Sequence, residues 1–225
     1  MSFYECLSVF PEGAASASRM ALTAKGLGYH GIIICNSDPG RIFMPQAVEQ
    51  VKGIVVAVGV EVTASGSKAL KSRISALRAR YPFLVVRAGT EETIRVACED
   101  PNVDLLMHPC EVRRPLGIAT ARAAKLNQIC IGFDLSPLVI LRGRARSRWL
   151  QALRRNLQLV RKFELLPIIT TSARSHLDLH SPRDPVAMAE VAGFEHDEAE
   201  EALRRPGTLL ALNRRKWIGP GVELL

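Results

Sequence analysis

Short apolar runs that recur between helical stretches place the strongest limit on how this chain can fold. The runs IIIC at 32–35 and IVVAVGV at 54–60 contain no charged side chain. Nearly continuous apolar runs are typical of parallel strands that are covered on both faces. The sequence therefore predicts an α/β protein with a parallel sheet. The expected strands cover residues 3–9, 31–36, 53–62, 83–87, 103–107, 129–133 and 165–170.

The order of these elements narrows the architecture to a parallel barrel or a doubly wound open sheet. Seven strand–helix units in 225 residues leave little room for a second domain, and their regular alternation favours the barrel. We therefore expect one domain over residues 1–225. The expected helices cover residues 14–27, 45–51, 68–81, 90–99, 115–126, 142–162, 186–192 and 197–204.

Residues 142–162 carry the most distinctive charge pattern of the chain. The segment holds eight Arg or Lys residues and no acid, whereas the whole chain has 30 basic and 22 acidic residues. The rest of the chain is therefore formally neutral, and the excess positive charge is local. On a helix, the apolar residues of the segment fall on one side and basic residues on the other. The basic face consists of Arg144, Arg148, Arg155, Arg161 and Lys162.

This basic face has two interpretations, a solvated helix surface or a site for a polyanion. Ordinary surface helices mix acidic and basic residues in i,i+4 pairs, so the absence of acids favours a polyanionic partner. Aromatic residues make up 5% of the chain, which argues against a platform that stacks on bases. We expect recognition of the phosphates and shape of a folded RNA by arginine side chains.

Composition also limits the compartment and the cysteine chemistry. No apolar run approaches the ~20 residues that span a bilayer, and residues 1–10 lack the pattern of a secretory signal. Five cysteines without a CxxC pair predict reduced thiols, with neither disulfides nor a zinc site. We expect a cytoplasmic protein that does not contact membranes.

Polar residues that follow the expected strands would collect at one end of a barrel. Such a ring could serve a hydrolase, or it could be the hydrogen-bonded collar of a barrel without catalytic activity. The alternative function is therefore a metal-dependent phosphoesterase that uses Glu61, His108, Asp134 and His176. The histidines of HLDLH at 176–180 are interpreted as ordinary loop residues. The strand-end residues are Asn36, Ser37, Asp38, Glu61, Arg87, His108, Asp134, Thr171 and Ser172.

Several segments together resemble a known family in their order and spacing. They are AKGLGYHGIII, GVEV, VDLLMHP, RNLQLVRKFELLPIITTSAR, SPRDP, ALNRRKW and the final GVEL. The family is that of the p30-type subunits of ribonuclease P, which includes protein component 3 of the archaeal enzyme. The resemblance covers essentially the whole chain. It implies a TIM-like (β/α) barrel of the polymerase and histidinol phosphatase type that lacks the metal ligands of those enzymes. The first strand has Tyr4, Glu5 and Cys6 where those enzymes have an HxH-type pair.

The resemblance also implies a function. In ribonuclease P the RNA subunit cleaves the 5′ leader from precursor tRNA with Mg²⁺, and the protein subunits fold and position the RNA. A chain of this kind would have no catalytic residue and bind no metal or cofactor. Its partners would be the RNA subunit, precursor tRNA, and the other proteins, with two copies each of components 2 and 3 in a heterotetramer. A scaffold that binds a protein partner, with incidental basic charge, remains a third possibility.

Residues are carried over from the family where its motifs match this sequence. They are Arg87, Arg95, His108, Asn156, Ser172, Arg183, Asp184, Asn213 and Arg214. Arg87, His108 and Ser172 are also strand-end residues. The arginines at 142–146 exceed the family pattern, so we expect them to steer association. The predicted RNA-binding residues are Arg87, Arg95, His108, Arg114, Arg144, Arg148, Arg155, Lys162, Ser172, Arg183 and Arg214.

Overall fold

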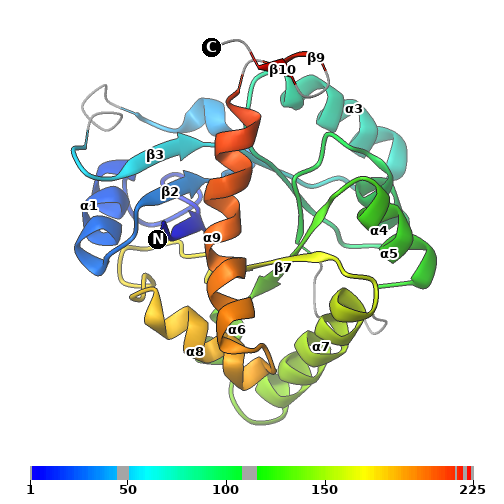
Figure 1. Ribbon diagram of the computed structural model, residues 1–225. Coiled ribbons are helices and arrows are strands. Elements are labelled where there is room, and N and C mark those ends of the chain that lie inside the picture. The colour runs from blue at the N-terminus through cyan, green and yellow to red at the C-terminus, as the bar shows by residue number, and fades with distance from the viewer. Residues whose placement is uncertain (1, 45–50, 108–115, 216, 220–221, 224–225) are drawn as a thin grey trace.

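The protein folds as a barrel of parallel strands surrounded by helices (Figure 1). The computed structural model describes residues 2–44, 51–107, 116–215, 217–219 and 222–223. Within these residues the expected α/β barrel is confirmed, and each predicted strand is present. The barrel strands are β1 (Tyr4–Leu7), β2 (Gly31–Ile34), β3 (Val55–Val58), β4 (Val60–Val62), β5 (Leu84–Arg87), β6 (Leu105–Met107), β7 (Cys130–Asp134) and β8 (Leu166–Thr170).

The strand expected at 53–62 is divided at Gly59 into β3 and β4. The first part pairs with β2 and the second pairs with β5, so this strand turns the corner between two hydrogen-bonded sheets. A Cβ at Gly59 would lie 2.6 Å from the carbonyl oxygen of Phe83. Glycine therefore permits the close approach of the neighbouring strand at this bend.

A buried carboxyl group joins β1 to β8 and completes the barrel. Glu5 has no exposed surface and accepts hydrogen bonds from the Thr170 hydroxyl at 2.5 Å and the Thr171 amide at 2.9 Å. The Ser8 amide donates to the carbonyl oxygen of Ala173 at 2.9 Å in the same seam. Burial raises the pKa of Glu5 from 4.5 to about 7, although these hydrogen bonds lower it in part. Glu5 is therefore a structural group of the seam.

The helices match most of the expected ranges and differ at some ends. The first begins after Ser16, whose hydroxyl caps it, and the last continues from the expected 204 to Asn213 through Pro206. The helix expected at 45–51 lies outside the described residues, apart from residue 51. The helices are α1 (Ala17–Leu27), α3 (Ser67–Arg78), α4 (Glu91–Glu99), α5 (Ile118–Leu126), α6 (Ser136–Ile140), α7 (Gly143–Lys162), α8 (Arg183–Ala192) and α9 (His196–Asn213). A 3-10 turn covers Pro39–Arg41, and a small hairpin pairs β9 (Trp217–Gly219) with β10 (Val222–Glu223).

The helix α9 covers the end of the barrel at which the strands begin (Figure 1). The ring of Tyr4 lies beside Gly31 and Gly207, where a Cβ would overlap it. At the end of α9, the Asn213 amide donates to the Pro82 carbonyl at 2.9 Å and to Asp104 at 2.8 Å. These contacts explain why the helix continues past the proline, because packing on the barrel outweighs one lost hydrogen bond. A functional site is therefore expected at the opposite end of the barrel, where the strands end.

Candidate nucleic-acid interface

The helix α7 presents the basic residues that the sequence predicts on one face. Its apolar side packs into the core, whereas Arg144, Arg148, Arg155 and Lys162 are exposed. Among the described residues, none of these four side chains has a hydrogen bond or an ion pair. The Lys162 ammonium lies 5.8 Å from the centre of the Phe163 ring. We call these four residues the α7 stripe.

Other cations of the same helix are used within the protein. The Arg161 guanidinium forms an ion pair with Glu198 at 2.6 Å and donates to the Gly193 carbonyl at 3.0 Å. Arg154 donates to the carbonyl oxygen of Val191 at 3.0 Å. Arg161 lies on the predicted basic face, but its guanidinium is engaged by an acid of the same protein. Its carboxylate partner comes from α9, and helical periodicity within one segment cannot reveal such a partner.

A cavity of about 480 Å³ opens at the carboxyl ends of β1, β5, β7 and β8. Arg87 lies in its wall, with Nε 2.9 Å from both oxygens of Glu61 and Nη2 2.9 Å from Oε2. Burial lowers the pKa of Arg87, but the hydrogen-bonded Glu61 carboxylate, with smaller contributions from Asp134 and Cys35, raises it above its ordinary value. The guanidinium is therefore held charged, with Nη1 outside the ion pair. We call this cavity the barrel mouth.

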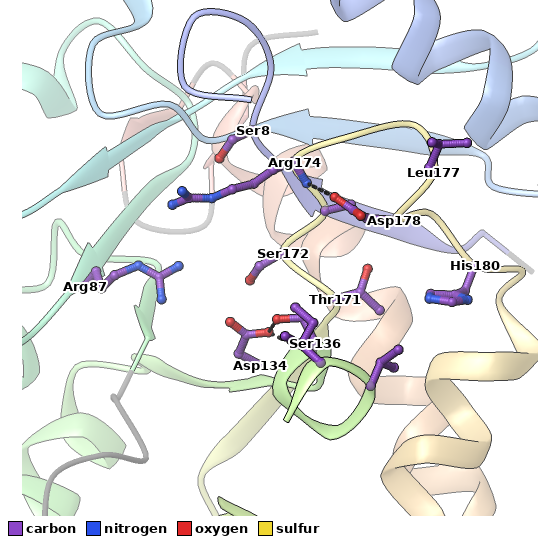
Figure 2. Close-up of a pocket in the computed structure, with 13 residues that line it drawn as sticks. Ser8, Arg87, Asp134, Ser136, Thr171, Ser172, Arg174, Leu177, Asp178 and His180 are labelled. Carbon is purple, nitrogen blue, oxygen red and sulfur yellow. Dashed lines mark hydrogen bonds between the residues drawn. The ribbon is translucent and has the colours of Figure 1, made fainter. Parts of the chain in front are cut away.

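Further polar groups surround the barrel mouth, as Figure 2 shows. Ser172 has a positive φ of 46°, and its amide donates to the Thr170 hydroxyl at 2.9 Å. Asp134 accepts from the amide of Ser136 at 3.0 Å and from its hydroxyl at 2.7 Å. The rule that places strand-end residues at one end of a barrel thus brings Arg87, Asp134 and Ser172 together, as the sequence predicts.

The residues of the alternative metal site do not meet at the mouth in the described structure. Glu61 is bound by Arg87, and His176 does not line the mouth; its Nε2 lies 3.5 Å from an Arg19 nitrogen. His108 lies outside the described residues. Among the residues that are described, no three His, Cys, Asp or Glu side chains form a group that could hold a metal ion. The geometry therefore gives the phosphoesterase hypothesis no support.

The remaining predicted RNA-binding residues occupy separate places. Arg95 is exposed on α4, and Arg183 begins α8 beside a second cavity of about 360 Å³. Arg214 follows α9 at the end of the barrel opposite to the mouth. Arg114, like His108, lies outside the described residues. The predicted set is thus not one continuous patch, and its individual RNA contacts stay predictions.

Two residues carried over from the family have structural partners. Asn213 ties the end of α9 to the barrel, and Asp184 accepts hydrogen bonds from the amide and hydroxyl of Ser181 at 3.1 and 3.0 Å. Sequence reasoning missed Arg174, whose side chain lines the mouth. Its position in TTSARS, shortly after the last strand, was the available signal.

Comparisons with known proteins agree over the full length. The profile of a family described as RNase P subunit p30 matches residues 5–217. Ribonuclease P protein component 3 of Methanosarcina mazei is 33% identical over 228 residues, which cover 99% of this chain and 95% of that protein. The protein of the same name from Haloarcula marismortui is 31% identical, with 98% and 96% covered.

Solved structures show the same fold. A chain in the cryo-EM structure of archaeal ribonuclease P with mature tRNA has a TM-score of 0.83 at 21% identity, with 99% of this chain and 97% of that chain covered. Histidinol phosphate phosphatase from Lactococcus lactis, solved with zinc, L-histidinol and phosphate, has a TM-score of 0.52 at 16% identity, with 86% and 95% covered. Among the described residues, no helix is long and apolar enough to cross a membrane.

Proposed function

The chain belongs to the ribonuclease P subunit p30 family, and we propose that it is an RNA-binding protein subunit of ribonuclease P. In this role it takes part in removing the 5′ leader from precursor tRNA. The observation that carries the proposal is the α7 stripe, because these four exposed cations form no hydrogen bond or ion pair with the described residues and are available for phosphates. The full-length similarity to ribonuclease P protein component 3 from several archaea supports ribonuclease P RNA as the partner.

The proposed role is noncatalytic. Two strand-end acids that could act on a substrate have partners within the protein, since Glu61 binds Arg87 and one oxygen of Asp134 binds Ser136. The RNA subunit would carry out the cleavage and hold the Mg²⁺ that the reaction needs. This chain would bind and position the RNA.

The proposed protein partner is ribonuclease P protein component 2. Two copies of each chain would form a heterotetramer that joins the RNA subunit, precursor tRNA and the other ribonuclease P proteins. The support for this assembly is family membership alone. Analytical ultracentrifugation of a mixture of the two purified chains tests it: a mass of two plus two chains is expected, and two separate species would refute it.

Salt dependence of RNA binding tests the role of the α7 stripe. Each phosphate contact contributes about −0.7 to −0.9 to the slope of log K against log salt. Replacing Arg144, Arg148, Arg155 and Lys162 by glutamine should therefore weaken binding of the RNA subunit and reduce the magnitude of the slope by about 3.

The matched control removes four exposed cations from α3, from the turn that follows it and from α5. The control variant carries glutamine at Lys68, Lys71, Arg80 and Arg122, which are exposed and lie outside the predicted RNA contacts. It loses the same net charge, so it should keep most of the affinity and slope. Equal losses of affinity and slope in the two variants would show that the stripe acts only through net charge. That result would overturn its assignment as a contact surface.

A further inference from the structure

The barrel mouth contains more hydrogen-bond donors than its own residues use. The Arg174 side chain lines the cavity without a hydrogen bond or ion pair among the described residues. Arg87 keeps Nη1 free of the Glu61 ion pair. Figure 2 shows both guanidinium groups on the side of the cavity where the Ser8 and Ser172 hydroxyls lie. This side of the mouth therefore suits an anion with several oxygen atoms.

A nearly buried threonine separates part of the mouth from the barrel interior. Thr171 is 3% exposed and lines the mouth, and its amide donates to the buried Glu5 at 2.9 Å. Its hydroxyl also contributes to the hydrogen bonding that lowers the pKa of Glu5. Figure 2 shows Thr171 on the other side of Ser172 from the two guanidinium groups.

The acids of the mouth are largely satisfied and do not require a cation. Asp178 accepts hydrogen bonds from the Arg174 and Ser175 amides at 3.1 and 2.8 Å. One oxygen of Asp134 is occupied by Ser136, and the other has no hydrogen-bond partner in the described structure. Asp134 can therefore accept a hydrogen bond from a hydroxyl group of a ligand.

An apolar wall completes the cavity. Val139, Ile140 and Leu177 line it and are exposed by 50%, 72% and 80%. These side chains can cover the flat face of a base, and a volume of about 480 Å³ can hold a nucleotide. Hydrogen-bond donors for a phosphate, an acceptor for a ribose hydroxyl and an apolar wall for a base thus occur in one cavity.

The mouth is also connected to the start of α7 through α6. The short helix α6 lines the mouth and leads directly into α7, where Arg144 begins the stripe. The Trp149 indole donates to the carbonyl oxygen of Asp134 at 3.1 Å and fixes α7 to the same edge of the barrel. An RNA strand that follows the stripe can therefore reach the mouth.

We propose that the barrel mouth binds one unpaired nucleotide of an RNA strand. Its phosphate lies between Arg87 and Arg174, its ribose hydroxyl faces Asp134, and its base covers the apolar wall. This inference rests on the proposed function and adds a nucleotide site to the stripe. It is a binding site, and no bond of the RNA changes there.

The test measures binding of a 5′-phosphorylated uridine trinucleotide to the full-length chain by fluorescence anisotropy. Arg174→Gln should weaken binding about tenfold, the effect of losing a charge-assisted hydrogen bond. Leu177→Ala should weaken it severalfold, whereas Arg122→Gln should leave it unchanged. Both replaced mouth residues have exposed side chains, so the variants should fold like the parent.

Three comparisons decide the outcome. Unchanged affinity in Arg174→Gln would overturn the site. Equal affinity for the deoxyribose trinucleotide would refute the contact with the ribose hydroxyl, and equal affinity for uridine 5′-monophosphate would assign the cavity to a free nucleotide instead of an RNA strand. The variant without the α7 stripe should keep trinucleotide binding and bind the RNA subunit more weakly, so the two proposals fail separately.

Discussion

The buried Glu5 side chain should make the stability of the barrel depend on pH in a defined direction. Burial raises its pKa from 4.5 to about 7 in the folded protein. Below pH 4.5 the group is protonated in both the folded and the unfolded chain, so it costs no stability. As the pH rises from 4.5 to 7, the unfolded chain loses this proton first and becomes relatively more favourable. Stability is therefore present at low pH and lost across this interval.

The size of the effect follows from the two pKa values. Their difference corresponds to about 3 kcal/mol of unfolding free energy, which is reached near pH 7 and stays constant above it. The Glu5→Gln variant cannot ionise, and its side-chain oxygen can still accept from the Thr170 hydroxyl and the Thr171 amide. The difference in stability between the parent and this variant should thus change by about 3 kcal/mol in favour of the variant between pH 4.5 and pH 8.

Urea unfolding followed by circular dichroism at these two pH values measures the difference. Other groups that titrate in this range are common to the two proteins and cancel in the comparison. Glu92→Gln, on an exposed position of α4, is the control and should follow the parent at both pH values. A Glu5→Gln variant with the same pH dependence as the parent would refute the argument that this carboxyl is buried without a cation to stabilise its charge.

Two further predictions concern residues that the structure places in internal contacts. Arg161→Gln should leave RNA affinity and its salt slope close to those of the parent. It should lower the free energy of unfolding in urea by less than about 1 kcal/mol, because the ion pair of Arg161 with Glu198 is partly exposed. An effect on the slope as large as that of Arg155→Gln would contradict this prediction. Asn213→Ala should cost about 2 kcal/mol, because it leaves the buried Asp104 carboxylate with one hydrogen bond fewer. The exposed Asn102→Ala variant is its control, and equal stability of the two would show that Asn213 does not hold α9 on the barrel.

The fold could be predicted from the sequence because its strands are short, apolar and regularly spaced. The division of the strand at Gly59 could not be predicted, because it depends on the carbonyl of Phe83 next to it. The extension of α9 past Pro206 was missed for a similar reason, since packing against Tyr4 and bonding of Asn213 stabilise a helix that local propensity would end.

The candidate site could be predicted from the sequence in part. The strand-end rule placed Arg87 and Ser172 at one mouth, and helical periodicity identified the α7 stripe. The pairing of Arg87 with Glu61 and of Arg161 with Glu198 joins residues from different elements. Periodicity reports which face of a helix a residue occupies, and it carries no information about the partner that meets that face.

Reconstituted cleavage of precursor tRNA measures whether the α7 stripe serves ribonuclease P. The assay combines this chain with the ribonuclease P RNA, component 2 and Mg²⁺, and measures release of the 5′ leader. We expect stimulation by the parent chain, strong loss of stimulation when the α7 stripe is replaced by glutamine, and no cleavage without the RNA subunit. Full stimulation by the stripe variant, or cleavage by the chain without the RNA, would refute the proposed role.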